Sequence, residues 1–222
     1  MKISEKDWKR FANTLGALSD KAMKEATEAL ASGDLSEAEA AVLLKRLADK
    51  YGEAAAAYAA EMYDNVATAA HANVPAAEAA AVKSERTIAA EVKRTDRNKW
   101  AAIPYKATKT AAVNTMLKNA RRDDAEAAWI TAGGACPFCM MISSRGWEKA
   151  KDVDKRTRHI HEHCRCMYAV RFDRNSSVGG YDPDALKEKW DSLSDEGYSG
   201  TTNKLNAWRR ELAAEERAKE QE

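Results

Sequence analysis

The sequence predicts a mainly α-helical protein with an N-terminal helical hairpin or bundle, a small β-hairpin module that contains all the cysteines, and a helical C-terminal tail. Alanine, glutamate, lysine and leucine are abundant, whereas the 222 residues include only 10 glycines and 4 prolines, a composition that favours helices. Apolar residues recur every three or four positions through the first half of the chain. The four cysteines are confined to residues 136–166. We therefore expect three segments, residues 1–127, 128–174 and 175–222.

Charge and hydropathy argue against a strongly basic or a membrane-spanning protein. The 36 Lys and Arg residues nearly balance the 35 Asp and Glu residues, and the net charge of +1 creates no global field toward nucleic acid or membranes. No apolar run approaches the ~20 residues that span a bilayer. The first residues, MKISEKDWKRFA, lack the apolar core of a secretory signal. We expect synthesis in the cytoplasm, whose reducing conditions keep thiols free.

Two amphipathic helices are predicted before residue 70. Ser4 or Asp7 would cap the first, whose apolar stripe comprises Trp8, Phe11, Leu15, Leu18 and Ala22. Gly33 would end that helix, and Ser36 with Glu39 forms a capping-box pattern that opens the second. The pair predicts an antiparallel hairpin. The alternative is a helix that packs on another protein, because an alanine-rich face buries little area per residue.

Two further helices are predicted before the cysteines. Pro75 suits the first turn of a third helix that runs to about Val92. The charged residues 93–99 would form a turn or a solvated face. A fourth helix is expected over 107–127, after the interruption at Pro104.

Around residue 129 the pattern changes from helix to strand. Residues 129–131 and 167–172 are expected to form two paired strands that bring the cysteine segments together. A module of roughly 45 residues is too small to fold on its own core. Residues 174–180 (RNSSVGG) have the composition of a flexible linker. Asp182 and Pro183 would start a helix to about Leu193, and a last helix would follow from Thr201 or Thr202, fraying beyond Ala214.

The cysteines and neighbouring histidines form a pattern typical of a closed zinc site. A C-x2-C pair is followed by an H-x-H-C-x-C cluster, and thiolates with imidazoles are the ligands that Zn²⁺ takes in tetrahedral sites. The candidate ligands are Cys136, Cys139, His161, His163, Cys164 and Cys166. Four cysteines would complete one site, and His161 or His163 would replace a cysteine in another; the sequence does not choose. Two disulfides or buried thiols are the alternatives.

A structural ion, not a catalytic one, is the favoured interpretation. A catalytic zinc needs an open position and a general base, and Glu162 is the nearest candidate base, but six potential ligands oversupply the ion. We therefore expect no enzyme activity. Residues 145–174 carry an excess of positive charge that could meet phosphate, although a solvated loop explains it equally well. The candidate phosphate contacts are Lys155, Arg156, Arg158 and Arg165.

Residues 129–147 (WITAGGACPFCMMISSRGW) and 159–166 (HIHEHCRC) together resemble the signature of the phage Mu F-like minor head proteins, in the branch found in phages of actinobacteria. The positions that carry the resemblance are Cys136, Cys139, Gly146, His161, Cys164 and Cys166. The family's histidine is often followed by proline, where this chain has Glu162.

The resemblance implies a minor capsid protein of head morphogenesis with structural zinc. It would be located in the phage head, bound to the portal protein or the major capsid protein, with non-specific DNA contact during packaging or ejection. The alternative from another class is a cytoplasmic zinc-ribbon-like nucleic-acid-binding protein, whose binding would fall steeply with salt.

Overall fold

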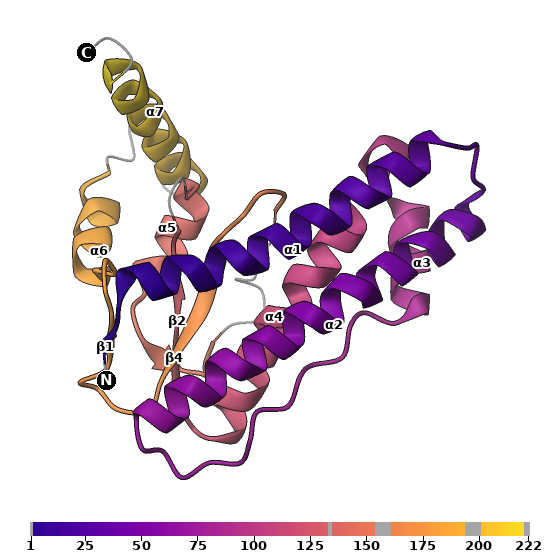
Figure 1. Cartoon of the computed structure of the whole chain (residues 1–222). Coiled ribbons are helices and arrows are strands. Elements are labelled where there is room, and N and C mark those ends of the chain that lie inside the picture. Colours follow the sequence, from indigo (N-terminus) through magenta and orange to yellow (C-terminus); the bar gives the residue numbers. More distant parts are fainter. Residues whose placement is uncertain (1, 133–134, 154–160, 194–200, 220–222) are drawn as a thin grey trace.

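The predicted hairpin is formed by two long helices, α1 (Glu5–Ala31) and α2 (Glu37–Ala69), which lie side by side along the molecule (Figure 1). The computed structural model describes residues 2–132, 135–153, 161–193 and 201–219. Ser4 caps α1, accepting a hydrogen bond from the Asp7 amide at 3.1 Å. Ser36 and Glu39 form the predicted capping box at the start of α2. The mainly helical fold class is confirmed.

Helix α4 (Ala102–Arg122) packs against both helices of the hairpin, and almost all of its faces are buried. It begins five residues earlier than predicted, because Pro104 lies in its first turn, where a missing backbone N–H is tolerated. It ends at Arg122, not near residue 127. Asp124, with φ of 49°, turns the chain from the helix into a strand.

The predicted third helix is wrong over its first part. Helix α3 spans only Glu85–Arg94, capped by Ser84, and residues 72–84, here called the strap, form no helix. Polar side chains of α2 and α4 bind the backbone of the strap, with hydrogen bonds from the amides of Ala77, Glu78 and Ala80 to Asp64 Oδ1 (2.7 Å), Asn119 Oδ1 (3.0 Å) and Thr115 Oγ1 (2.9 Å). These acceptors hold the chain extended because they occupy donors that a helix would need.

Strands β2 (Glu126–Ile130) and β4 (Met167–Arg171) are antiparallel, which confirms the predicted strand pair. A short strand that was not predicted, β3 (Glu148–Lys149), pairs with the other edge of β2. The segment predicted as a linker is structured: β5 (Ser177–Val178) pairs in parallel with β1 (Lys2–Ile3), and Val178 is buried. A buried valine and a strand partner from the N-terminus outweigh the linker-like composition.

Three shorter helices complete the fold: α5 (Pro137–Ser143), α6 (Pro183–Ser192) and α7 (Thr201–Lys219). Trp190 of α6 and Trp208 of α7 face each other with ring centroids 6.1 Å apart, and Trp208 is buried. Helix α7 contacts α5, and its far end extends away from the body (Figure 1). It continues to Lys219, past the residue where fraying was expected.

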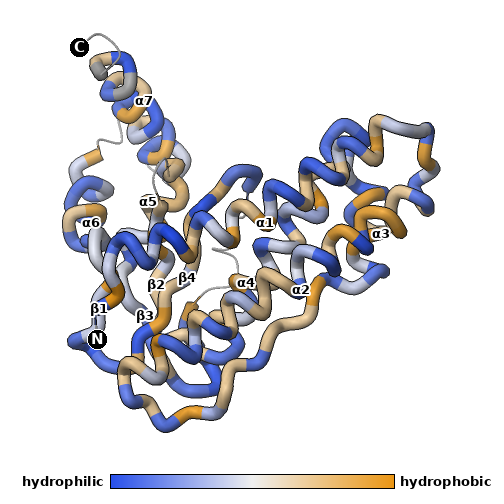
Figure 2. Tube along the Cα trace, in the orientation of Figure 1, coloured by the Kyte–Doolittle hydropathy of each residue, from blue (hydrophilic) through white to orange (hydrophobic). Residues whose placement is uncertain are grey.

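The larger apolar core joins all parts of the chain. It contains residues from each of the three predicted segments, among them Trp8, Cys139 and Trp208. The division of the chain at residues 127 and 174 stays a prediction. A second, smaller core fills the outer half of the hairpin with α3. Hydrophilic and apolar residues alternate along α1 and α2, as expected for helices with one buried face (Figure 2). Within the described ranges, no helix combines the length and apolarity that a membrane crossing requires.

Candidate metal centre

The cysteine segments meet at one end of the β2–β4 pair. Ile130 at the end of β2 is paired with Met167 at the start of β4, so the residues that follow β2 and precede β4 lie together. Cys136 is the N-cap residue of α5, and Cys139 lies in its first turn. Pro137 at the first helical position favours this sharp start, because its fixed φ suits a helix N-terminus. The sheet register therefore assembles the site.

Five predicted ligands form two overlapping groups. Cys136, Cys139 and His161 make one group, and Cys139, Cys164 and Cys166 make the other; within each group the ligand atoms lie within 4.8 Å of one another. The Cys139 and Cys164 sulfurs are 3.8 Å apart, and Cys136 Sγ is 3.3 Å from His161 Nε2. Zn–S bonds of ~2.3 Å in a tetrahedron separate the sulfurs by about 3.8 Å. The side chains therefore fit a zinc ion.

All four cysteines are free thiols in the structure, so it does not support the two-disulfide alternative. Three of them, Cys139, Cys164 and Cys166, are at most 3% exposed, whereas Cys136 is half-buried. A disulfide would need sulfur atoms about 2 Å apart. Cys139 is the only residue common to both ligand groups, so it is the centre of the cluster.

The two candidate histidines have different positions. His161 faces Cys136 through Nε2, while its Nδ1 lies 2.8 Å from the Glu162 carbonyl oxygen, a contact that orients the ring as in many metal sites. His163 is not brought into either group. Its φ of 60° turns the chain away, its side chain is 69% exposed, and its Nδ1 lies 3.6 Å from Asp20 Oδ1 on α1.

The thiols share protons in a way that suits a cation. Hydrogen bonding from Cys139 lowers the pKa of Cys164 to about 2 and that of Cys136 to about 5. The pKa of Cys139 is raised, because its proton is held between Cys136 and Cys164. The pKa of Cys166 is also raised, to about 12: its hydrogen bond with Cys139 lowers the pKa, but its hydrogen bond with Cys164 and burial raise it by more. Two thiolates beside two protonated thiols form an anionic cluster, and a bound metal ion displaces such protons.

A buried lysine lies directly beneath this cluster. Lys109 of α4 has no exposed surface and donates through Nζ to the Cys164 carbonyl oxygen; the hydroxyl of Tyr105 donates to the same oxygen at 3.2 Å. Burial lowers the pKa of Lys109, and the negative charges of Cys164 and Cys166 oppose that shift. Sequence reasoning missed this residue. The available signal was its position four residues after Tyr105, on a face of α4 that is otherwise apolar.

Comparison with known proteins identifies the family of the chain. A family model described as VG15 protein matches residues 2–193, which include the hairpin, α4, the sheet and every candidate ligand. The chain belongs to the VG15 family. VG15 is a family of phage virion proteins, so the predicted phage origin and virion location are supported at that level. No curated protein and no solved structure matches the chain.

The phosphate contacts predicted for this VG15 protein are only partly within the described residues. Lys155, Arg156 and Arg158 lie outside them. Arg165 has an intramolecular partner: its Nη2 is 2.5 Å from Asp20 Oδ2 of α1, and its side chain is 28% exposed. Arg165 therefore connects the metal-ligand segment to the hairpin.

Gly16 provides the space for this connection. A Cβ atom placed on Gly16 would lie 2.0 Å from Arg165 Nη1, so the guanidinium crosses α1 where the helix has no side chain. No other residue type leaves this path open. The glycine costs the helix about 1 kcal/mol relative to alanine, a cost that the ion pair offsets.

We expect Gly16→Ala to displace Arg165 and break its ion pair with Asp20. Because the two partly buried charges would then be separated, the free energy of unfolding should fall by about 1–3 kcal/mol. Urea unfolding measures the loss. Gly33→Ala is the matched control, since nothing lies within 4 Å of a Cβ atom at Gly33. In an Arg165→Ala background, Gly16→Ala should cost nothing further. Equal costs in both backgrounds would show that Gly16 serves another purpose.

Proposed function

We propose that this VG15 family member is a minor capsid protein of the Mu F-like head-morphogenesis type, in which a structural zinc ion fixes the sheet to the helical body. It would be attached to the portal protein or to the inner side of the major capsid protein, and it would have no enzyme activity. The observation that carries the proposal is the cluster of four reduced cysteines with His161, located where β2, β4 and α5 converge. Membership of a virion protein family supports the setting.

The ligand set supports a closed site. Five side chains lie in two overlapping groups that share Cys139, and a tetrahedral ion that takes four of them would have no coordination position for a reacting water. Cys136, Cys139, Cys164 and Cys166 would supply four thiolates, and His161 would replace Cys166 or Cys164 in a three-thiolate site. When bound, zinc supplies cross-links between segments that are 25 residues apart in sequence. Such an ion stabilises the fold and does not act on a substrate.

DNA contact belongs to the proposal in a limited form. Its candidates are the basic residues of the segment between the two ligand groups, Lys155, Arg156 and Arg158. The alternative function, a zinc-ribbon-like nucleic-acid-binding protein, is weakened because Arg165 already pairs with Asp20. A virion protein family also fits a cytoplasmic regulator less well.

Complementation of a phage that lacks this gene tests the proposal. We expect the wild-type chain to be recovered in purified heads with one zinc ion per copy, and to be cross-linked to the portal or major capsid protein. Cys139→Ser should lose both the zinc and the head incorporation. Met140→Leu, a size-conserving change on the same helix, is the control. Purified protein that is folded but free of metal would disprove the structural zinc, and a chain missing from heads would disprove the assembly role.

A further inference from the structure

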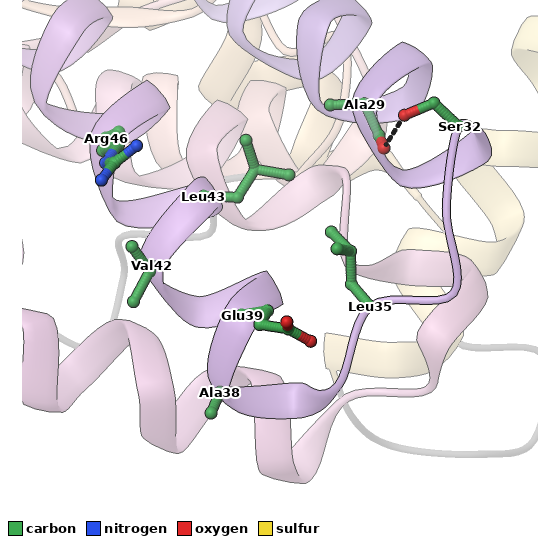
Figure 3. A pocket seen from close by; sticks show the side chains of 8 residues that line it. All are labelled: Ala29, Ser32, Leu35, Ala38, Glu39, Val42, Leu43 and Arg46. Carbon is green, nitrogen blue, oxygen red and sulfur yellow. Dashed lines mark hydrogen bonds between the residues drawn. The ribbon is translucent and has the colours of Figure 1, made fainter.

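A hollow that the metal centre does not use lies at the tip of the hairpin. It has a volume of about 550 Å³ and is formed between the end of α1 and the first turns of α2 (Figure 3). Leu35 from the connecting loop and Leu43 from α2 point toward one another across it. Val42 lies at its edge and is 43% exposed, the one large apolar side chain in the described parts of the chain with that degree of exposure. The hollow is therefore an apolar surface on an otherwise polar tip.

The charges around the hollow are arranged symmetrically along α2. Glu39 and Arg46 both line the hollow and both are exposed. They are seven positions apart, two helical turns, and Val42 and Leu43 lie midway between them. Ala38, at the same surface, is small enough to permit close approach of another helix. Along this face of α2, an acidic residue is followed by two apolar residues and then by a basic residue.

Such an order is self-complementary when two identical helices run in opposite directions. With the two-fold axis between positions 42 and 43, Glu39 of each copy lies opposite Arg46 of the other. Val42 of each copy then meets the apolar hollow of its partner. Both charges have free capacity: Glu39 uses Oε2 for the capping box, and among the residues that the structure describes Arg46 has no ion pair.

We propose that this face of α2 binds a second copy of the chain in an antiparallel, two-fold symmetric contact. The contact covers about two turns of each helix, so it is small compared with a permanent dimer interface, and the association is reversible. It is independent of the metal centre, because the hollow belongs to the smaller core in the outer half of the hairpin. The result is a pair of chains joined tip to tip, with both sheets pointing outward.

Thiol cross-linking of the purified, zinc-loaded full-length chain tests this contact. A short bismaleimide should join two Val42→Cys chains, because position 42 lies beside the symmetry axis. Ala57→Cys, exposed on the same helix, is the matched control. In the proposed pairing, two copies of position 57 would be about 40 Å apart along the helix axes and should not react. The wild-type chain measures any reaction of the native cysteines.

Exchanging the charges at positions 39 and 46 tests whether the two α2 helices pair in the antiparallel direction. In the Val42→Cys background, Arg46→Glu should reduce cross-linking about tenfold, because it places two acids opposite each other. Adding Glu39→Arg to that variant should restore it. Circular dichroism monitors the loss of the capping box in the double variant. Absent cross-linking at position 42, equal cross-linking at position 57, or failure of the exchange to restore the product would each overturn the proposal.

Discussion

Cys139→Ser is expected to abolish metal binding and to lower the melting temperature by on the order of 10 °C or more. Cys139 is the residue shared by both ligand groups, so its loss leaves neither group complete. Structural zinc contributes ~10–16 kcal/mol in zinc-finger peptides. That is comparable with the ~5–15 kcal/mol stability of a whole domain. Elemental analysis and calorimetry of the purified chain measure the two effects.

Two comparisons make this result specific. Cys136→Ser should cost less, because it leaves the group of Cys139, Cys164 and Cys166 intact. A chelator should lower the melting temperature of the wild-type chain to that of Cys139→Ser and leave the variant unchanged. If Cys139→Ser retains zinc and melts with the wild type, the ion does not bind at this cluster.

Lys109→Met is expected to weaken zinc binding about 10- to 100-fold, the range found when groups that support metal ligands are removed. A site with three or four thiolates and one Zn²⁺ carries a net negative charge. Lys109 is fully buried, and in the described part of the chain no carboxylate pairs with it, so the thiolates are its counter-charge. Methionine keeps the length and apolar stem of lysine but removes the ammonium group and its hydrogen bond to the Cys164 carbonyl.

Competition with a chromophoric chelator measures the zinc affinity of this variant. Stability alone does not decide the question, since an apolar residue in place of a buried charge is sometimes stabilising. Lys106→Met is the control, because this residue is on the same helix and only partly buried. An unchanged affinity in Lys109→Met would mean that the ammonium group supports the Cys164 carbonyl without balancing the site.

Local patterns predicted the parts of the fold in which each residue depends on near neighbours. The stripe from Trp8 to Ala22 and the capping box at Ser36 are local signals, and both helices formed where expected. The β2–β4 pair was also predicted, because two apolar runs flank ligands that must meet. Five of the six candidate ligands cluster, for the same reason.

Features that depend on distant partners were missed. The strap has a helical composition, but Asn119 and Thr115, more than 30 residues later, take its backbone donors. The composition of residues 174–180 is typical of a linker, and the sequence does not show that β5 within them pairs with the N-terminal strand β1. Lys109 was not singled out, because neither the burial of α4 on all sides nor the Cys164 carbonyl that accepts from its ammonium group is visible in the sequence.

The strap is held largely through its main chain, and a few of its side chains add contacts: Glu78 pairs with Lys118 at 2.6 Å, and Ala77 and Val82 pack against the apolar cores. Three amides and the Glu78 carbonyl are bound by Asp64, Thr115 and Asn119, and Arg122 reaches two further carbonyls at positions 75 and 76. The main-chain hydrogen bonds do not depend on the identity of the side chains at these positions. Substitutions at the exposed positions Ala76, Ala79 and Ala81 should therefore be tolerated, while the information that shapes the path of this stretch resides in two helices elsewhere in the chain.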